Sequence, residues 1–451
     1  MLDPNYVFEN FDLILNNCQR RQININSVGV ENFPKIYQER KKIIQQIENL
    51  RNTRNSLSKK TNHSENDIIE ARKIKTEIQN LEQKLKNIEK KYYEILSWIP
   101  NVASEDAPIG KNSDDNIEHK AWTEQKGIIS RQAINKAGKV QFLMPAFPKF
   151  LNQLSEARDH VEIGKILNII DLEQSAKVSG TRFSYLRGAL VLMQNALHQL
   201  MIERLLSENF IPMIPPLLVK DKALFGSSHF PGDKDQVYAI KNDNIEDNNQ
   251  LYLVGSAEPS LFSYFQDKII DQTQLPFKAF ALTTCFRSEV GSWGKDVRGL
   301  KRVHQFDKLE MNAVVLPEKS NEMMEYFLSI NEWLLQSLKI PYRVLSMCTG
   351  DLGYYAASKK YDVEAWLPSQ QEFMELMSDT NTTDYQARRL NIKVKLENGS
   401  KIIPHTVNDT GIAMGRMLIA IIDNYQKSDG SVEIPKVLHK YMFGIKEIKR
   451  E

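Results

Sequence analysis

A long segment without glycine constrains the fold of this chain more than any other feature. Residues 31–98 contain no glycine and a single proline, Pro34, near the start of the segment. Apolar side chains recur there in alternating steps of four and three residues, at Ile74, Ile78, Leu81, Leu85, Ile88, Tyr92 and Ile95. Arg54 takes one position of the same rhythm upstream, and the other positions there are Ile43, Ile47, Leu50 and Leu57. This heptad spacing predicts two long helices that pack along an apolar seam.

A polar stretch separates the two halves of this segment. It has the sequence TNHSEND, residues 61–67, and is poor in helix-forming residues. The pattern therefore predicts a turn there and an antiparallel coiled-coil arm over about residues 30–98. With about 30 residues in each helix and a rise of about 1.5 Å per residue, such an arm would extend about 45 Å.

The charge of this arm leaves its role open. The segment contains 15 Lys or Arg against 10 Asp or Glu, and Arg, Lys and Asn are concentrated in residues 51–63, at the predicted tip. One interpretation is a solvated hairpin that makes contacts between subunits. The other is an arm that contacts a polyanion, because basic segments attract phosphate groups.

Composition argues against a secreted protein held by disulfides and against a membrane protein. The chain has 451 residues, enough for two or three domains, and a net charge of +2. Its three cysteines, Cys18, Cys285 and Cys348, are too scattered for a disulfide framework or a zinc site, which predicts a reducing, cytoplasmic location. The first residues, MLDPNYVFENFDLI, have acids where a signal peptide has bases. No apolar run is long enough to span a membrane, so we expect no membrane partner.

The stretch WIPNVASEDAPIG, residues 98–110, predicts a domain boundary. It contains two prolines and a glycine, which end the preceding helix. We therefore expect an N-terminal domain over residues 1–110, which includes the arm, and a second domain over residues 111–451.

The second domain has a mixed pattern of helices and strands. Helices are expected at residues 161–177 and 186–210, and an edge strand at residues 211–219, because prolines are excluded from central strands. Further strands are predicted at residues 250–258, 277–289, 303–316, 342–350, 361–368 and 392–407. The sequence contains neither of the glycine-rich loops of the common nucleotide folds. The predicted fold class is α+β, with a largely antiparallel sheet flanked by helices.

Residues 287–310, RSEVGSWGKDVRGLKRVHQFDKLE, are a candidate binding hairpin. They contain six Lys or Arg and one His against four Asp or Glu, and residues 290–300 are a glycine-rich loop. Strand alternation puts Arg287 with Glu289 on one face, and on one face of the second strand it puts Arg302, His304, Phe306, Lys308 and Glu310. An arginine, an aromatic ring and carboxylates suit a nucleotide. A surface hairpin with salt bridges is the alternative.

Residues 411–422, GIAMGRMLIAII, predict a buried helix whose only charge is Arg416. A buried lone arginine requires an anion, which is either a carboxylate of the chain or a phosphate of a ligand. Glu258, after an apolar strand, and Glu375 with Ser378 are further candidates. Taken alone, each of these carboxylates is more simply explained as an ordinary solvated acid.

Taken together, these segments resemble the bacterial-type seryl-tRNA synthetases, a family of class II aminoacyl-tRNA synthetases, over essentially the whole chain. IPPLLV is similar to motif 1 of the family, FRSE through RVHQFDKLE to motif 2, and NDTGIAMGRMLIAIIDNYQ to motif 3. The other matching stretches are DHVEIG, AKVSGTRFSYLRG, SAE, CTGDLGYYAASKKYDVEAWLP, DYQARR and DGSVEIPKVLHKYM.

The resemblance implies a fold and a reaction. Family members have a six-stranded antiparallel sheet with helices, and an N-terminal coiled-coil arm that holds the tRNA. Serine is activated with ATP and Mg²⁺ to seryl-adenylate and then transferred to the 3′ end of tRNA(Ser), with selenocysteine tRNA left open as a second substrate. Motif 1, here with Pro216, implies a homodimer in which the arm of one subunit serves the other.

The resemblance also implies roles for single residues. Arg287, with the α-phosphate, and Arg416, with the γ-phosphate, would be the catalytic residues. Glu289 would hold the adenine amino group, Arg302 the outer phosphates, and Phe306 would stack on the adenine. The remaining ATP contacts would be Ser288, Glu375, Leu376, Met377 and Ser378, of which Glu375 and Ser378 would also hold Mg²⁺. The serine pocket would comprise Ser256, Ala257, Glu258, Glu310 and Thr410.

Three short stretches depart from the usual family pattern. SAE, followed by Pro259, replaces TAE, and ELMSDTN puts Met377 and Asp379 where Ser and Cys are common. NDTG replaces NGSG, which introduces Asp409 and Thr410. The exchanges between Ser and Thr keep a hydroxyl group, whereas Asp409 adds a charge near the expected pocket.

Three other function classes compete with a serine–tRNA ligase. A purely structural coiled-coil protein would not explain a buried arginine at position 416. A non-catalytic tRNA-binding paralogue would be expected to lose motif residues, yet Arg287, Glu289, Arg302, Glu310 and Arg416 are all present. An enzyme that loads an amino acid onto a carrier protein would be expected to lack the basic arm.

Overall fold

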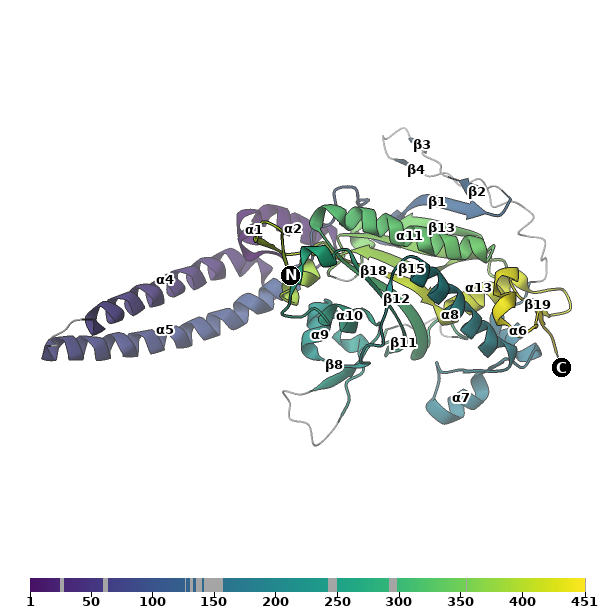
Figure 1. Ribbon diagram of the computed structural model, residues 1–451, viewed down its shortest axis with the longest axis horizontal. Coiled ribbons are helices and arrows are strands. Elements are labelled where there is room, and N and C mark those ends of the chain that lie inside the picture. Colours follow the sequence, from purple (N-terminus) through teal and green to yellow (C-terminus); the bar gives the residue numbers. More distant parts are fainter. Residues whose placement is uncertain are drawn as a thin grey trace. The chain divides into compact units, whose positions relative to one another are not determined.

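The computed structural model describes residues 1–24, 28–59, 64–125, 127–129, 133–134, 140–141, 157–241, 250–291, 298–353 and 355–450 (Figure 1). The chain divides into two compact units, Met1–Val102 and Ala103–Glu451. Among the described helices, none has both the length and the apolar character needed to cross a lipid bilayer.

The first unit is helical and contains the arm. Its elements are α1 (Pro4–Glu9), α2 (Phe11–Arg20), a short 3₁₀ turn (Val30–Asn32), α4 (Phe33–Ser58) and α5 (Glu65–Trp98). Helices α4 and α5 lie side by side (Figure 1). The predicted seam residues form one apolar cluster, in which Ile43, Ile47, Leu57, Ile74 and Ile78 are buried and Leu50, Leu81, Leu85 and Ile88 pack against them.

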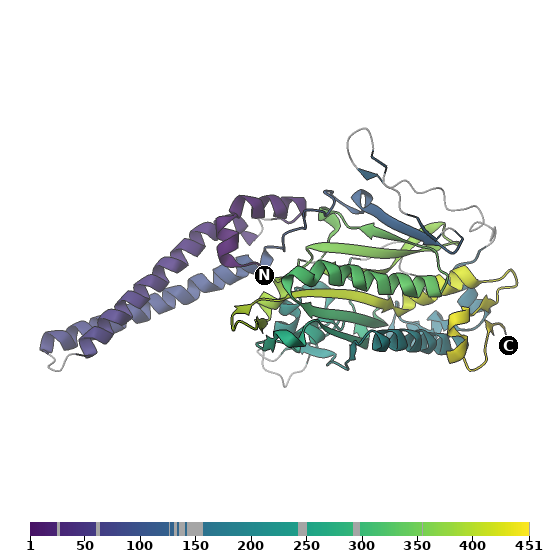
Figure 2. The ribbon, with the colours of Figure 1, turned by 45° about the horizontal axis from the view of Figure 1, so that its top comes forward.

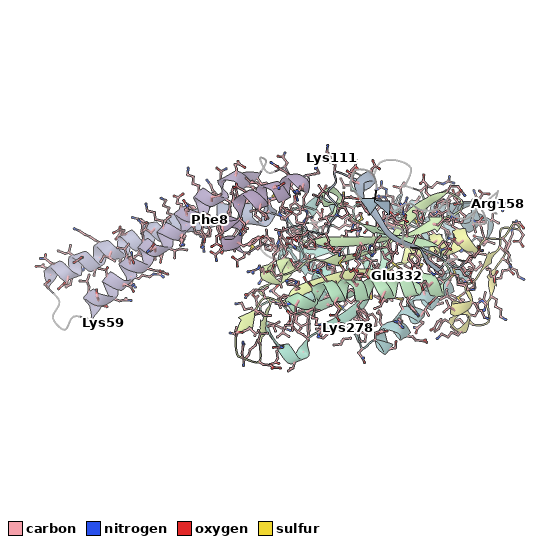
Figure 3. The ribbon with its side chains drawn as sticks, turned by 90° about the horizontal axis from the view of Figure 1, so that it is seen from above. Phe8, Lys59, Lys111, Arg158, Lys278 and Glu332 are labelled. Carbon is pink, nitrogen blue, oxygen red and sulfur yellow. The ribbon has the colours of Figure 1, made fainter. Side chains whose placement is uncertain are left out.

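Ion pairs along the seam show that α4 and α5 are antiparallel. Arg40 Nη2 lies 2.8 Å from Glu89 Oε1, and Arg51 Nη2 lies 2.8 Å from Glu82 Oε1, so the partner number falls as the residue number rises. Helix α5 begins with a capping box between Ser64 and Asp67. Lys59 lies at the far end of the arm (Figure 3). The rest of the predicted basic tip, residues 60–63, lies outside the described residues.

The second unit is built on one sheet. Within the described residues nine strands follow the order β2-β1-β13-β14-β15-β18-β12-β11-β7. All neighbours are antiparallel except β7 and β11, which are parallel. The strands are β1 (Ile117–Thr123), β2 (Gly127–Ile129), β7 (Ile211–Pro212), β11 (Phe277–Phe286), β12 (Gln305–Val315), β13 (Tyr342–Ser346), β14 (Lys359–Leu367), β15 (Glu372–Asn381) and β18 (His405–Ala413).

The small sheets are β3 (Ala133–Ile134) with β4 (Val140–Gln141), β5 (Ile170–Asp171) with β6 (Tyr185–Leu186), β8 (Leu218–Lys220) with β9 (Leu251–Leu253), β10 (Ile269–Asp271) with β16 (Lys393–Lys395) and β17 (Lys401–Ile402), and β19 (Val432–Glu433) with β20 (Glu447–Ile448). The helices are α6 (His160–Ile166), α7 (Leu172–Ser179), α8 (Ala189–Ser207), α9 (Asp221–Gly226), α10 (Glu258–Ser263), α11 (Ser320–Ser337), α12 (Tyr385–Arg389) and α13 (Met414–Tyr425).

Helix α11 covers one face of the large sheet, along which it lies in Figures 1 and 2. Its side chains Phe327, Leu328 and Leu335 join Leu309 and Met311 of β12 in the main apolar core. Glu332, on α11 in Figure 3, is paired with Lys120 of β1 at 2.7 Å, which ties the helix to the far strands. The α+β class with an antiparallel sheet flanked by helices is therefore confirmed.

Several predicted boundaries were wrong in detail. The expected helix at residues 161–177 is divided into α6 and α7 at Asn168, which has a left-handed backbone with φ 55°. The expected edge strand at residues 211–219 is two strands in two different sheets, of which β7 is at the edge of the large one. Strand β15 was missed, and residues 411–413, expected to be helical, complete β18.

Candidate active site

A polar cleft of two connected lobes opens on the sheet, on the face away from α11. Both lobes are lined by Arg287, Glu289, Arg302, Lys308, Glu375 and Thr410. The Phe306 lobe is completed mainly by residues 300–303, Phe306, Leu376, Ala413, Gly415 and Arg416. The Glu310 lobe, of about 440 Å³, is completed mainly by His229, Asp233, Gln236, Ser256, Glu258, Glu310, Lys360, Ser378, Thr380 and Asn408.

Two β-bulges change which side chains face the cleft. Without them, strand alternation would place some of these side chains on the opposite face of the sheet. In β15 the register with β14 shifts, so that Glu375 and Ser378 both face the cleft although they are three residues apart. In the pairing of β12 with β18 the register shifts at Gly411, so that Thr410 and Ala413 both line the cleft. The bulges therefore determine which side chains meet in the cleft.

The motif 2 residues gather in the Phe306 lobe. Arg287 Nε donates to the carbonyl oxygen of Gly255 at 3.2 Å, and its guanidinium lies 5.4 Å from the centre of the Phe306 ring. Arg302 Nη1 lies 3.7 Å from Glu289 Oε2, and the Glu289 backbone is left-handed with φ 49°. None of these three charged residues lies on a regular strand, because Arg287 and Glu289 follow the end of β11 and Arg302 precedes the start of β12. Residues 292–297 of the predicted loop lie outside the described residues.

Arg416 and Glu375 form an ion pair on the cleft wall. Arg416 Nη1 lies 3.2 Å from Glu375 Oε1 and also donates to the Glu375 carbonyl oxygen at 3.1 Å. Burial tends to raise the pKa of Glu375, but the nearby Arg416 and Lys360 outweigh it and lower that pKa. Both alternatives for Arg416 therefore have support, because it has a carboxylate partner and still faces the cleft, with 21 % of its side chain exposed.

The Glu310 lobe holds a buried ion pair. Lys308 Nζ lies 2.5 Å from Glu310 Oε2, and the two side chains are only 7 % and 3 % exposed. Burial raises the pKa of Glu310, and the Lys308 charge opposes that rise. Glu258 lies in the same lobe, where Gln386 Nε2 donates to its Oε1 at 2.6 Å and Asn408 Nδ2 at 3.0 Å. The lobe thus presents oriented carboxylates, which suit an ammonium and a hydroxyl group.

Known proteins resemble this chain over its full length. Residues 1–103 match the seryl-tRNA synthetase N-terminal domain, and residues 238–425 match the tRNA synthetase class II core domain (G, H, P, S and T). The serine–tRNA ligase of Rubrobacter xylanophilus is 36 % identical over 449 residues, with 98 % of both chains covered. That of Dictyoglomus turgidum is 37 % identical over 455 residues, with 100 % of this chain and 99 % of the relative covered. The chain belongs to the seryl-tRNA synthetase family.

Solved structures agree with this membership. The crystal structure of seryl-tRNA synthetase from Pyrococcus horikoshii complexed with ATP has a TM-score of 0.86 and 35 % identity, with both chains covered completely. The cytoplasmic serine–tRNA ligase from Naegleria fowleri in complex with AMP has a TM-score of 0.81 and 28 % identity, with 100 % of this chain and 99 % of that chain covered. The resemblance, the class II fold and the serine–tRNA ligase activity expected from the sequence are confirmed.

Some predicted seryl-tRNA synthetase site residues have surroundings that the sequence did not indicate. Ala257 and Met377 are buried in apolar clusters, so they would reach a ligand through their backbone. The Ser288 hydroxyl donates to the carbonyl oxygen of Asp235 at 2.6 Å. Asp409 does not face the cleft, because it accepts hydrogen bonds from Asn331 of α11 on the opposite face.

Sequence reasoning also overlooked residues of the cleft. Lys308 was placed on the right face but given no role, although it lines both lobes. His229 and Lys360 line the Glu310 lobe, and the buried Gln386 supports that lobe by donating to Glu258. These residues come from separate parts of the chain, and no spacing in the sequence connects them with Glu310. DYQARR, the stretch that contains Gln386, matched the family pattern, which was the one available signal for it.

Replacing Arg416 tests the electrostatics of Glu375. Because the folded-state pKa is lowered, the pair stabilises the fold above the ordinary glutamate pKa, and this contribution is lost as pH falls through the folded value. We expect Arg416→Ala to raise the pKa of Glu375, because burial is then opposed mainly by Lys360. Arg416→Lys, which keeps a cation, should raise it less. Titration of carbon-13-labelled glutamate by NMR, assigned with Glu375→Gln, measures the shift, and an unchanged pKa in Arg416→Ala would contradict this interpretation.

Proposed function

We propose that the cleft activates L-serine with ATP and that the two lobes divide the substrates, with ATP in the Phe306 lobe and serine in the Glu310 lobe. The observation that supports this division is the position of Arg287, which lines both lobes. The two substrates would therefore meet at one guanidinium group. The ATP and AMP complexes of the two similar solved structures agree with a nucleotide in this fold.

In the first step a carboxylate oxygen of serine attacks the α-phosphorus of ATP. The new bond joins serine to AMP, the bond to the outer phosphates breaks, and pyrophosphate leaves with that electron pair. The serine carboxylate is already a nucleophile, so the protein needs no general base and acts by positioning and charge neutralisation. Arg287 would neutralise the α-phosphate, and Arg302 and Arg416 the outer phosphates.

The adenine would lie on the Phe306 ring. Glu289 would accept from the adenine amino group, which requires it to give up part of its pairing with Arg302. The 3.7 Å separation of that pair and the 40 % exposure of Arg302 make such an exchange inexpensive, since exposed ion pairs contribute only about 0–1 kcal/mol. Leu376, with the backbone of Met377 and Ser288, would complete the ATP contacts.

In the Glu310 lobe the serine ammonium would bind near Glu258 and Ser256, and the hydroxyl near Glu310 and Thr410. The Glu258 backbone amide donates to Ser256 Oγ at 3.2 Å, which fixes this turn. Ala257 would contribute its backbone. Glu310 and Thr410 are cross-strand partners on β12 and β18, so they form one continuous surface.

Glu375 and Ser378 would hold Mg²⁺, which supplies positive charge to the outer phosphates when bound. They share the cleft face through the β15 bulge, and the lowered pKa of Glu375 keeps its carboxylate ionised. Across the part of the chain that the structure describes, no three His, Cys, Asp or Glu side chains gather as a metal site. Phosphate oxygens would therefore have to complete the ligand set, as is usual for Mg²⁺.

In the second step a hydroxyl oxygen at the 3′ end of tRNA(Ser) attacks the carbonyl carbon of the seryl-adenylate. An ester bond to serine forms, the bond from that carbon to the AMP oxygen breaks, and AMP leaves with its electron pair while the hydroxyl proton is released. The family places the tRNA on the arm, and the excess of Lys and Arg over Asp and Glu in residues 31–98 is consistent with phosphate contacts. Selenocysteine tRNA stays open as a further substrate. A cytoplasmic location, supported by three cysteines that are all free and buried, is part of the same proposal.

A homodimer would form through motif 1. Strand β7 is at the edge of the large sheet, and three apolar side chains of residues 211–218 are exposed, namely Ile211 of β7 at 46 %, Ile214 at 100 % and Leu218 of β8 at 45 %. Apolar side chains clustered at a sheet edge favour burial against a partner. Pro216 lies within the same stretch.

Substitutions at Glu310 and Thr410 test the serine pocket. A site built to hydrogen-bond a hydroxyl rejects the analogue without it by about 10⁴, because its polar groups are left unpaired. We expect Glu310→Ala to abolish serine-dependent ATP–pyrophosphate exchange, and Glu310→Gln, which keeps an acceptor, to retain part of it. Thr410→Ser should be mild and should admit more threonine. Exchange rates with serine, alanine and threonine measure this, and an unchanged preference for serine over alanine in Glu310→Ala would refute the assignment.

Shortening the arm tests whether tRNA charging depends on the arm while serine activation does not. Arg40 and Glu89 are paired across the helices at 2.8 Å, so residues 41–88 can be replaced by a short Gly-Ser turn at that level. We expect normal serine-dependent pyrophosphate exchange and loss of tRNA charging. Charging by the full chain should fall steeply with added salt, as expected for phosphate contacts. Full charging by the shortened chain would show that the arm is not the tRNA contact.

Ile214→Asp tests the dimer. An aspartate in an apolar interface should shift the chain from dimer to monomer in sedimentation at micromolar concentration. Val178→Asp, at another exposed apolar position, serves as the control and should leave the dimer intact. If the unaltered chain sediments as a monomer and is fully active, the proposed homodimer is wrong.

A further inference from the structure

The hairpin formed by β11 and β12 continues past the end of its regular ladder. The last pair of that ladder is Phe286 with Gln305. One further connection follows: the Arg287 N–H donates to the carbonyl oxygen of His304 at 3.0 Å, and the His304 ring returns a bond through Nδ1 to the Arg287 carbonyl oxygen at 2.9 Å. Glu289 lies beyond this connection, outside any strand. The groups that fix Glu289 must therefore come from outside the ladder.

Arg182 reaches both arms of this hairpin from a separate part of the chain. It lies between α7 and β6, in the stretch GTRF, residues 180–183. Its carbonyl oxygen accepts from the His304 N–H at 2.9 Å, and its Nη1 donates to the Glu289 carbonyl oxygen at 2.8 Å. One residue thus connects the arm that leaves β11 with the arm that enters β12.

The turn that carries Arg182 is itself held in place. Its backbone at Arg182 is left-handed, with φ 63°. The buried Ser175 of α7 donates through Oγ to the carbonyl oxygen of Phe183 at 2.7 Å, and the rings of Phe183 and His304 are 5.3 Å apart. A residue other than glycine keeps a left-handed backbone only where its surroundings determine it. The Arg182 side chain therefore extends from a fixed main chain.

Glu289 is also left-handed, with φ 49°, and its neighbours are bonded on both sides. The Ser288 N–H donates to the carbonyl oxygen of Gln236 at 3.0 Å, and Gln236 Nε2 donates to the carbonyl oxygen of Val290 at 2.9 Å. Arg182 holds the Glu289 carbonyl oxygen between them. A bond from a guanidinium is charge-assisted and stronger than the neutral bonds of Gln236. The Arg182 bond therefore sets the orientation of this peptide, and with it the direction in which the Glu289 side chain extends.

We propose that Arg182 is a positioning residue that fixes Glu289 as the acceptor of the adenine amino group and so sets the preference of the enzyme for adenine. In the described part of the chain Arg182 is not among the residues that line either lobe of the cleft. It acts through Glu289 rather than on the substrate. The inference rests on the proposed position of adenine beside Glu289.

Purine riboside triphosphate, which differs from ATP only in lacking the 6-amino group, is the probe for this role. A carboxylate that accepts from the amino group should favour ATP in kcat/KM by about 10- to 100-fold, the contribution of one hydrogen bond to a charged group. When the carboxylate is displaced, the amino group no longer has its acceptor, and this preference is lost.

Arg182→Met removes the donor and keeps most of the side-chain length. We expect it to reduce the preference for ATP to less than about threefold, through a lower kcat/KM for ATP, and to leave the KM for serine unchanged. Arg182→Lys, which keeps a cation without the planar fork, should retain part of the preference. Arg187→Met is the matched control, because Arg187 lies in the same stretch and its Nη1 is bonded to Asn168 Oδ1 at 2.7 Å. It should keep the full preference.

Serine-dependent pyrophosphate exchange measures kcat/KM with each nucleotide. The ratio of the two values does not depend on the fraction of active enzyme, so partial unfolding of a variant cannot imitate the effect. Arg182→Lys, the milder change, supplies this ratio if Arg182→Met has too little activity to measure. Adding Arg182→Met to Glu289→Ala should cause no further loss of preference, because both changes remove the same contact.

Full preference for ATP in Arg182→Met and Arg182→Lys would overturn the inference. An equal loss of kcat/KM with both nucleotides would also overturn it, because that is the result expected of a general structural role, and so would an additive loss of preference in the double variant. Full preference in Glu289→Ala alone would show that Glu289 does not bind the adenine. That result would overturn this part of the proposed function together with the inference.

Discussion

The alternation of side chains along β12 and β18 is the constraint on which the rest of the second unit depends. On β12, Leu309 and Met311 enter the core beneath α11, while Lys308 and Glu310 face the cleft. The same strands therefore supply the apolar surface that holds the sheet and the charged surface that lines the cleft. A shift of one residue in register would exchange the two faces, so the extensive apolar packing against α11 also fixes the position of every charge in the cleft. The packing that stabilises the second unit therefore also sets the positions of the charged side chains in the cleft.

The sequence was most informative where one periodic pattern continued over many residues. The heptad of residues 31–98 predicted α4, α5 and their seam, because seven or more matching positions leave few alternatives. Alternation also predicted the cleft face of β12. It failed for β15, where the bulge between Glu375 and Ser378 interrupts the period of two. The boundary between β18 and α13 was also predicted wrongly, and residues 411–413 were assigned to the helix. Both the end of the strand and the start of the helix are apolar, so the sequence contains no signal that separates them.

The site was harder to predict than the fold for a related reason. Lys308 and Glu310 are two residues apart, and their spacing suggested a shared face, but nothing in the sequence indicated that burial would force them into an ion pair. His229 and Lys360 reach the cleft, and Gln386 reaches Glu258, only through the tertiary fold. Asp409 was expected near the pocket from its sequence position, although strand alternation places the residue before Thr410 on the opposite face of the sheet. That expectation weighted proximity in sequence above the period of the strand.

Charged side chains of the cleft form ion pairs with one another in the absence of substrate. Arg302 lies near Glu289, Arg416 near Glu375 and Lys308 near Glu310. Arg302 of the first pair and Glu375 of the second pair are at least 40 % exposed, so water screens both pairs and a phosphate can compete for the arginines. The Lys308–Glu310 pair is buried, and breaking it would leave an unpaired charge at a cost of about 3–5 kcal/mol. Under the proposed division of substrates, the Phe306 lobe can therefore rearrange around the nucleotide, while the Glu310 lobe must keep its geometry for serine. A rigid pocket suits the rejection of amino acids that differ from serine by one small group, because discrimination of that kind fails when the pocket adapts to the wrong ligand.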